Sequence, residues 1–294
     1  APTANGCPVK FNNTVNIGTG TFYPIHAGTV EMNGVLTAGT VNPAYSCTLQ
    51  LGVDNAFAGS PVLAMGQGDQ VGTLNLNGHP VTVSSLSSTH ANNVITSATA
   101  GTLTVNHSAD CDYGGKLTGA GLSILKAGAG TLTISGTANT LGGTVTAIAG
   151  KLHVSGSLPG GSTVVISNTA TLMGVGSVGS ARIMSGGTAD PGATVGAAGT
   201  LNSGNLVLSA GAIYRAHITG ASTRDLLNVT GTVGLTNATL SILVSGHTPN
   251  IGDSHTVIAN DGTDAIGGTF SGLAEGAVVS DGTYYFQISY VGGT

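Results

Sequence analysis

The stretch that decides the fold is residues 128–156, with the sequence GAGTLTISGTANTLGGTVTAIAGKLHVSG. Apolar and small polar residues alternate in its strand-like pieces, for example in TLTI at 131–134. A period of two places successive side chains on opposite faces of a β-strand, so each piece can bury one face. Gly, Asn and Ser separate the pieces and favour turns. The stretch therefore predicts short strands joined by tight turns.

Units of the same kind recur along the chain, each with Gly, then Thr, Ser or Lys, then alternating apolar positions. They lie at residues 27–30, 38–41, 100–105, 130–134, 143–147, 150–154, 161–166, 198–201 and 231–235. Such self-similarity is typical of architectures in which one turn stacks on the next. No segment has the 3.6-residue period of an amphipathic helix. The repeats therefore predict an all-β protein.

The size and spacing of the units favour a β-solenoid over a sandwich or a barrel. Units fall about 7 to 13 residues apart in the middle of the chain, which suits all three architectures. A sandwich usually has longer strands and more large residues between its sheets, whereas the inward positions here are mostly Leu, Val, Ile and Ala. We expect a narrow right-handed parallel β-solenoid of about 12–14 turns, with roughly 20–25 residues per turn and a C-terminal β cap.

Charge is scarce in this chain. Lys, Arg, Asp and Glu make up 6% of its 294 residues, against about 25% in a typical soluble domain. Equivalent positions of a solenoid lie about 5 Å apart, where like charges repel, whereas Thr, Ser and Asn can form hydrogen-bonded ladders. The 40% hydrophobic content excludes a disordered chain, and seven basic residues are too few for a surface that follows nucleic-acid phosphates. We therefore expect stacked, nearly neutral turns and no nucleic-acid partner.

The stretch at 128–156 resembles the passenger-associated β-strand repeat of bacterial autotransporters, in which a Gly-x-Gly-Thr-Leu strand, an Asn-Thr turn and a Gly-Gly-Thr strand follow one another. The segments 173–192, 225–233 and 261–276 are similar to later parts of such surface proteins. The resemblance implies a parallel β-helix displayed or secreted outside the cell. It divides the chain into an N-terminal β region over 1–125, a repeat-like solenoid over 126–225 and a C-terminal strand region over 226–294.

The compartment is expected to be extracellular, at a bacterial cell surface. The chain starts with Ala1-Pro2-Thr3, which we expect to follow a removed signal peptide. No run of about 18 apolar residues is present, so we expect no membrane-spanning helix. Of the three cysteines, Cys7 and Cys47 are the favoured disulfide pair; alternatively, all three, including Cys111, are small buried apolar residues.

Polysaccharide hydrolases and lyases on β-helices need paired carboxylates, or a base together with a charge-neutralising group. Residues of these types occur in three places: Asp110 and Asp112 near Lys116, Arg224 beside Asp225, and Asp261 with Asp264. None of these groups recurs at a spacing that would line one groove. We therefore expect no catalytic residue and no enzymatic activity.

Cofactor and metal motifs are weak in this chain. The GxGxxG pattern at 174–179 has no following helix to bind phosphate, and the Asn-Asp-Gly-Thr-Asp segment at 260–264 lacks the distal Glu of a calcium loop. Both are interpreted as turns. The eight histidines show no paired metal-binding spacing and lie at 26, 79, 90, 107, 153, 217, 247 and 255. We expect no cofactor and no metal.

The ends of the chain are the favoured contact surfaces. Phe286, Ile288 and Tyr290 share one face of the aromatic strand 284–291, which is either a cap strand or a strand that pairs with a neighbouring molecule. Pairing through this strand or through 10–17 makes a non-closing contact and hence filaments. We expect an extracellular structural protein that polymerises end to end. The alternatives are a monomeric adhesin for a surface glycan or cell-surface partner and, third, a polysaccharide-active enzyme.

Overall fold

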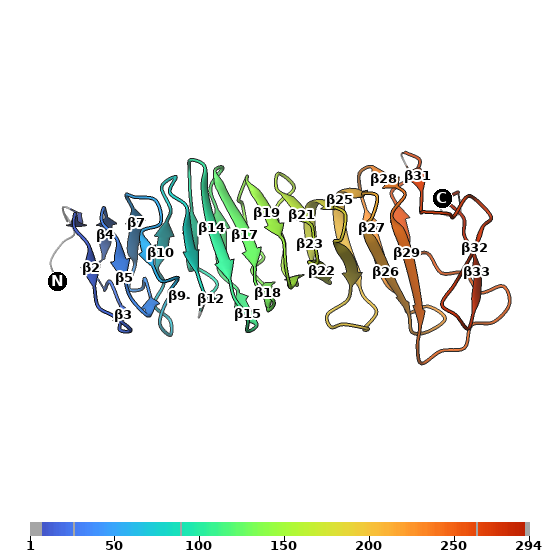
Figure 1. Cartoon of the computed structure of the whole chain (residues 1–294), viewed down its shortest axis with the longest axis horizontal. Coiled ribbons are helices and arrows are strands. Elements are labelled where there is room, and N and C mark those ends of the chain that lie inside the picture. Colours follow the sequence, from blue (N-terminus) through green and yellow to red (C-terminus); the bar gives the residue numbers. More distant parts are fainter. Residues whose placement is uncertain (1–7, 26, 89, 263, 292–294) are drawn as a thin grey trace. The chain divides into compact units, whose positions relative to one another are not determined.

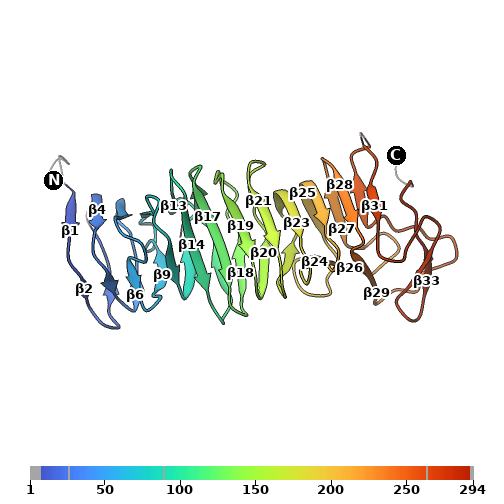
Figure 2. The same cartoon turned by 45° about the horizontal axis from the view of Figure 1, so that its top comes forward.

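The computed structural model describes residues 8–25, 27–88, 90–262 and 264–291 (Figure 1). Over these ranges the chain forms a parallel β-solenoid of about 10 turns and a small C-terminal antiparallel sheet, and it contains no helix (Figure 2). This confirms the predicted all-β solenoid. The strands fall into two compact units, residues 1–146 with 156–162 and residues 147–155 with 163–294.

The first unit consists of parallel strands stacked turn on turn. One sheet has the order β1 (Val9–Phe11), β4 (Gly28–Met32), β7 (Cys47–Leu51), β10 (Thr73–Asn75), β13 (Val94–Thr96) and β16 (Lys116–Thr118). A second has the order β2 (Val15–Asn16), β5 (Leu36–Thr37) and β8 (Phe57–Ala58). A third has the order β12 (Ser85–Ser88), β9 (Val62–Met65), β6 (Thr40–Val41) and β3 (Thr21–Phe22).

Two further parallel sheets begin later in the first unit. One is built from β11 (Val81–Val83), β14 (Gly101–Asn106) and β17 (Leu122–Ala127), and the other from β15 (Cys111–Tyr113) and β18 (Thr131–Ile134). The strand β19 (Thr144–Ala147) lies in the sequence where the two units adjoin.

The second unit continues the same construction. One sheet has the order β21 (Thr163–Ile166), β23 (Ser177–Ile183), β25 (Thr200–Leu208), β27 (Leu226–Val229) and β30 (Ile258–Asn260), and the end of β25 also pairs with β28 (Val233–Thr236), which pairs with β31 (Gly267–Thr269). The other has the order β20 (Lys151–Val154), β22 (Thr171–Gly174), β24 (Thr188–Pro191), β26 (Ile213–Ile218) and β29 (Thr239–Val244). The antiparallel pair is β32 (Val278–Ser280) and β33 (Tyr285–Gln287).

Burial follows the alternation seen in the sequence. In β20, Leu152 and Val154 are fully buried, whereas Lys151 and His153, which alternate with them, are partly exposed. Leu152 lies directly opposite Leu172 of the next turn, so like residues stack in register. Polar residues stack as well: Asn228 donates its amide N–H to Asn202 Oδ1 at 2.9 Å, from directly opposite positions. The expected neutral ladder is therefore present.

The number of turns is lower than the 12–14 expected. Asn12 and Asn33, which contact each other on successive turns, are 21 residues apart, whereas Asn202 and Asn228 are 26 residues apart. Other turns are shorter: Thr163 and Ser180, which are paired on successive turns, are 17 residues apart, so the length of a turn varies along the chain. In addition, the residues after β31 (Gly267–Thr269) form the antiparallel pair instead of further parallel turns.

Candidate functional site

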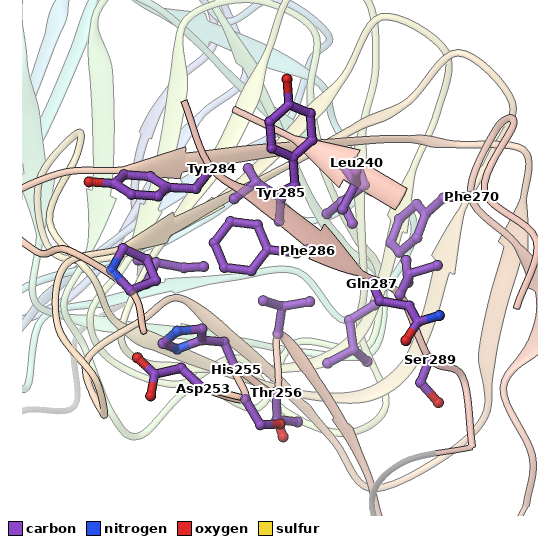
Figure 3. Close-up of a pocket in the computed structure, with 18 of the residues that line it drawn as sticks. Leu240, Asp253, His255, Thr256, Phe270, Tyr284, Tyr285, Phe286, Gln287 and Ser289 are labelled. Carbon is purple, nitrogen blue, oxygen red and sulfur yellow. The ribbon is translucent and has the colours of Figure 1, made fainter. Parts of the chain in front are cut away.

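A cavity of about 840 Å³ lies between the last solenoid strands and the C-terminal antiparallel pair (Figure 3). Leu240 and Ile242 of β29 line one side, and Phe286 of β33 lines the other. These side chains are apolar, while Asp253 and His255 bring ionisable groups to the same cavity. A concave space lined by both apolar and polar groups can hold a small ligand.

Backbone and carboxylate hydrogen bonds hold the antiparallel pair beside the solenoid. The Asp281 carboxylate accepts the backbone N–H groups of Thr283 and Tyr284, both at 2.8 Å, and that of Val244 at the end of β29, at 3.3 Å. These bonds, with Tyr284 contributing most, lower the pKa of Asp281. One side chain therefore closes the turn before β33 and fastens it to the solenoid.

Of the predicted C-terminal strand 284–291, only Tyr285–Gln287 forms a strand, β33, and residues on both sides of that segment line the cavity. Phe286, Ile288 and Tyr290 all line it. The Tyr290 hydroxyl donates to the carbonyl of Leu273 at 2.7 Å and accepts the backbone N–H of Phe270 at 3.0 Å. The face thus packs within its own chain, and its use between subunits stays a prediction.

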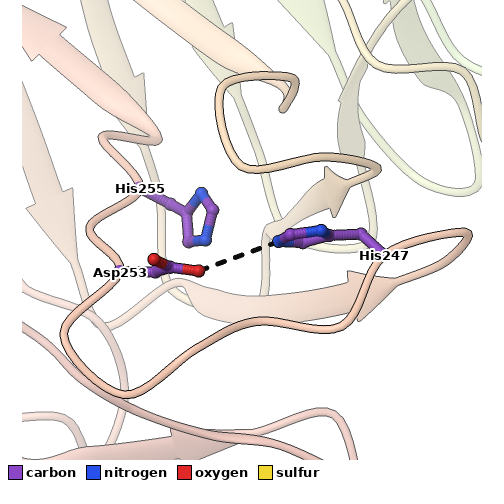
Figure 4. A group of neighbouring side chains, drawn as sticks. All are labelled: His247, Asp253 and His255. Carbon is purple, nitrogen blue, oxygen red and sulfur yellow. Dashed lines mark ion pairs between the residues drawn. The ribbon is translucent and has the colours of Figure 1, made fainter.

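Two histidines and an aspartate gather at the edge of the cavity (Figure 4). His247 follows β29, and Asp253 and His255 precede β30. One ligand atom from each of the three lies within 4.8 Å of the others, and His247 Nε2 is 3.9 Å from Asp253 Oδ2. The His255 ring also packs edge-on against Phe286, with the ring centroids 6.1 Å apart. Sequence spacing did not identify this group, because a loop and a turn bring the three together.

A second ionisable cluster is buried inside the second unit. His217 Nδ1 lies 2.8 Å from Asp225 Oδ2 and 3.3 Å from Asp190 Oδ1, and Arg215 donates to the other Asp190 oxygen at 3.0 Å. Asp225 also accepts the backbone N–H groups of His217 and Gly199, both at 2.9 Å. Burial raises the pKa of Asp225 despite these bonds. Through these contacts the cluster links β24 and β26 to the residue that precedes β27.

The two carboxylates of the first unit that were candidates for a catalytic pair accept hydrogen bonds between turns of the solenoid. Asp110 accepts the backbone N–H of Thr131 at 2.7 Å, and Asp112 accepts the hydroxyl of Ser135 at 2.6 Å. Both bonds join one turn to the next. The residue predicted near them, Lys116, begins β16, in a different sheet from Asp112.

The other candidate residues from the sequence do not form a shared site either. Arg224 donates to the carbonyls of Thr256 and Ser222, at 2.9 and 3.1 Å, whereas the neighbouring Asp225 points inward. Asp261 and Asp264 lie in the loop after β30, where the Asn260 amide donates to the Asp264 carbonyl. The GxGxxG segment runs from the end of β22 into β23, so it joins two strands.

Cys111, His107 and Lys126 form a third cluster. Cys111 Sγ lies 3.6 Å from His107 Nδ1, and burial raises the pKa of its thiol. Lys126, in the same neighbourhood, is fully buried and donates to the carbonyls of Ala127 and Gly128. Cys47 is buried at the start of β7. Its expected partner, Cys7, lies outside the described residues, so that disulfide stays a prediction.

These features define a parallel β-solenoid protein with a cavity at its last turns. No protein-family model matches the chain, and a search of curated proteins finds no significant match. Among the described residues, no helix has the length and apolar character needed to cross a membrane.

Proposed function

We propose that this chain is the subunit of an extracellular filament or matrix fibre that assembles by strand pairing between copies. The observation that carries the proposal is the open edge at the first turn. Within the described residues, β1, β2 and β3 each pair with a strand on one side only, namely β4, β5 and β6. A free strand edge is a template for pairing with another chain.

The side chains near this edge favour contact with a second copy. Val9, Ile17 and Ile25 are 40, 40 and 63% exposed. The charged residue on β1, Lys10, is paired with Glu31 of the next turn at 2.8 Å. A lysine commonly protects an edge strand from pairing, but here an ion pair compensates its charge. Among the described residues, this edge therefore combines backbone groups that have no strand partner with exposed apolar side chains.

The last strands of the second unit supply a different surface for the same contact. The strands β29, β30, β31 and β33 each have one edge without a strand partner in the described part of the chain. A contact between the first turn of one copy and this end of the next is heterologous, so it does not close and generates a filament. The scarcity of charge and the resemblance to the autotransporter passenger repeat support an extracellular structural role.

Electron microscopy and sedimentation of the purified chain test the proposal over a wide concentration range. We expect filaments for the native chain and dispersed monomers for the Val9→Lys, Ile17→Lys double variant. Val195→Lys is the matched control, because Val195 is 58% exposed but lies between β24 and β25, away from the first turn. Only dispersed native monomers at every concentration would contradict assembly. Filaments that persist in the double variant would contradict the first turn as the contact.

A second candidate function is a monomeric adhesin for a surface glycan. The aromatic lining of the cavity favours it, because the rings of Tyr284, Phe286 and Tyr290 lie together there with polar groups nearby. Aromatic side chains offer a large apolar face with specific geometry. Glycan-array binding by monomeric protein, lost in Phe286→Ala, would support this function. Equal signals from the two proteins would exclude the cavity as the glycan site.

A further inference from the structure

We propose that His247, Asp253 and His255 form a binding site for a divalent transition metal, with zinc as the best fit. The site is independent of the proposed assembly. Two imidazole nitrogens and a carboxylate oxygen are ligands that zinc takes in proteins, whereas calcium needs six to eight oxygens. The chemistry of this donor set therefore favours zinc.

The positions of the donors are close to those that coordination requires. Zn–N and Zn–O bonds are about 2.0–2.2 Å, so donors around a tetrahedral zinc lie roughly 3.3–3.6 Å apart. The ligand atoms here lie within 4.8 Å of one another, and the His247 Nε2–Asp253 Oδ2 distance is 3.9 Å. Closing around an ion requires movements of about 1 Å or less, within the reach of side chains on a loop.

Unsatisfied imidazole nitrogens supply the second observation. His247 Nε2 and both nitrogens of His255 are shielded from solvent and have no hydrogen-bond partner. A buried polar atom without a partner costs about 1–3 kcal/mol. A metal ion bound by one nitrogen of each ring would relieve two of these three atoms. The arrangement is therefore explained by a ligand that accepts electron pairs from both rings.

The surroundings keep the donors available for a cation. Asp253 Oδ2 accepts the backbone N–H of Asn250 at 2.7 Å, which orients the carboxylate as an outer-shell partner does. The Arg224 guanidinium donates to the carbonyls of Thr256 and Ser222.

Three protein ligands leave a fourth position for water or a ligand, as in catalytic zinc sites. Asp253 and His255 line the 840 Å³ cavity. The open position is therefore available to a small oxygen donor that enters from the cavity. This feature distinguishes the site from a closed structural zinc site, which has four protein ligands.

Equilibrium dialysis against ZnCl₂ tests the site, using the full chain without a histidine tag. We expect one ion per chain. The His247→Ala, His255→Ala double variant should weaken binding by more than the roughly 10- to 100-fold that loss of an outer-shell partner costs. His79→Ala is the matched control, because His79 also contacts an aspartate, Asp54 at 2.7 Å, but no third ligand lies with this pair in the described part of the chain. It should bind zinc like the native chain.

Cobalt replacement gives a readout that does not depend on comparing affinities. A low-coordinate Co²⁺ site of nitrogen and oxygen ligands absorbs visible light strongly, and this band should be present in the native chain and in His79→Ala. It should be absent from the double variant, whose folding is checked by circular dichroism. Native protein that binds no zinc, or a double variant that binds zinc and cobalt as the native chain does, would overturn the proposal.

Discussion

Removing the Asp225 carboxylate should destabilise the second unit far more than removing a similar carboxylate at the surface. Asp225 is fully buried and accepts three hydrogen bonds, from the backbone N–H groups of Gly199 and His217 and from His217 Nδ1. Asp54 contacts His79 at 2.7 Å, nearly the same distance as the 2.8 Å between Asp225 and His217, but its side chain is 67% exposed. The two pairs therefore differ mainly in burial.

The size of the effect follows from the groups left behind. Asp225→Ala leaves two backbone N–H groups without their acceptor, at about 1–3 kcal/mol each. Breaking a buried ion pair costs about 3–5 kcal/mol, and this overlaps with the first cost. The Asp190 carboxylate, 3.3 Å from His217 Nδ1, limits the loss by keeping a partner for the ring. We therefore expect a loss of about 3–5 kcal/mol, against about 0–1 kcal/mol for Asp54→Ala.

Urea unfolding followed by circular dichroism measures the free energy of unfolding for both variants. Hydrogen exchange of the β26 amides locates the effect, because a solenoid can open locally. We expect faster exchange in β26 for Asp225→Ala and native exchange there for Asp54→Ala. If both variants lose less than about 1 kcal/mol, the buried network does not stabilise these turns and the reasoning is wrong.

Three further results are expected. Burial lowers the pKa of Lys126 to about 8 from an ordinary 10.5, so between these values this lysine binds fewer protons in the folded chain than in the unfolded one. Lys126 should therefore contribute a rise in the free energy of unfolding from pH 8 to 10.5, and urea titrations should show a more positive pH slope for the native chain than for Lys126→Met. Gly174 has φ +119°, and an added Cβ would lie 2.1 Å from the Val154 carbonyl oxygen, so Gly174→Ala should lower the melting temperature. The Cβ of Gly160→Ala would meet no atom within 4 Å, so this control should have an unchanged or slightly higher melting temperature. Zinc affinity should fall on acidification, because protons compete with the metal for the imidazole nitrogens. Dialysis at pH 5.5, 6.5 and 7.5 checks this, and pH-independent affinity would contradict histidine ligation.

The repeated pattern predicted the parts of the fold that depend on local structure. Alternation at 131–134 and 151–154 corresponds to β18 and β20, whose inward residues are buried. The polar ladder also follows from the pattern, because equal side chains at equal positions meet when turns stack, as Asn202 and Asn228 do. The number of turns was overestimated, since chain length per turn depends on loops that have no period.

The candidate sites were not predictable in the same way. Asp190 and His217 meet because β24 and β26 are neighbouring strands, and the chain that turns back after β26 brings Asp225 to them, although their sequence neighbours carry no shared motif. His247 and His255 come together through the turn from Asn250 to Asp253, which the Asn250 N–H bond to the carboxylate stabilises. Loop conformation depends on such individual contacts, and periodicity carries no information about them.

Stacked short strands require only a two-residue alternation of apolar and polar side chains, with frequent turn residues between the strands. Both features are local properties of the sequence. The sequence alone therefore determined that the chain forms a parallel coil of short strands with few charges. The tertiary structure alone decided which ionisable side chains meet and where a cavity remains. Those outcomes depend on the register between turns and on irregular loops, because electrostatic and ligand-binding contacts act over a few ångströms between residues that are distant along the chain.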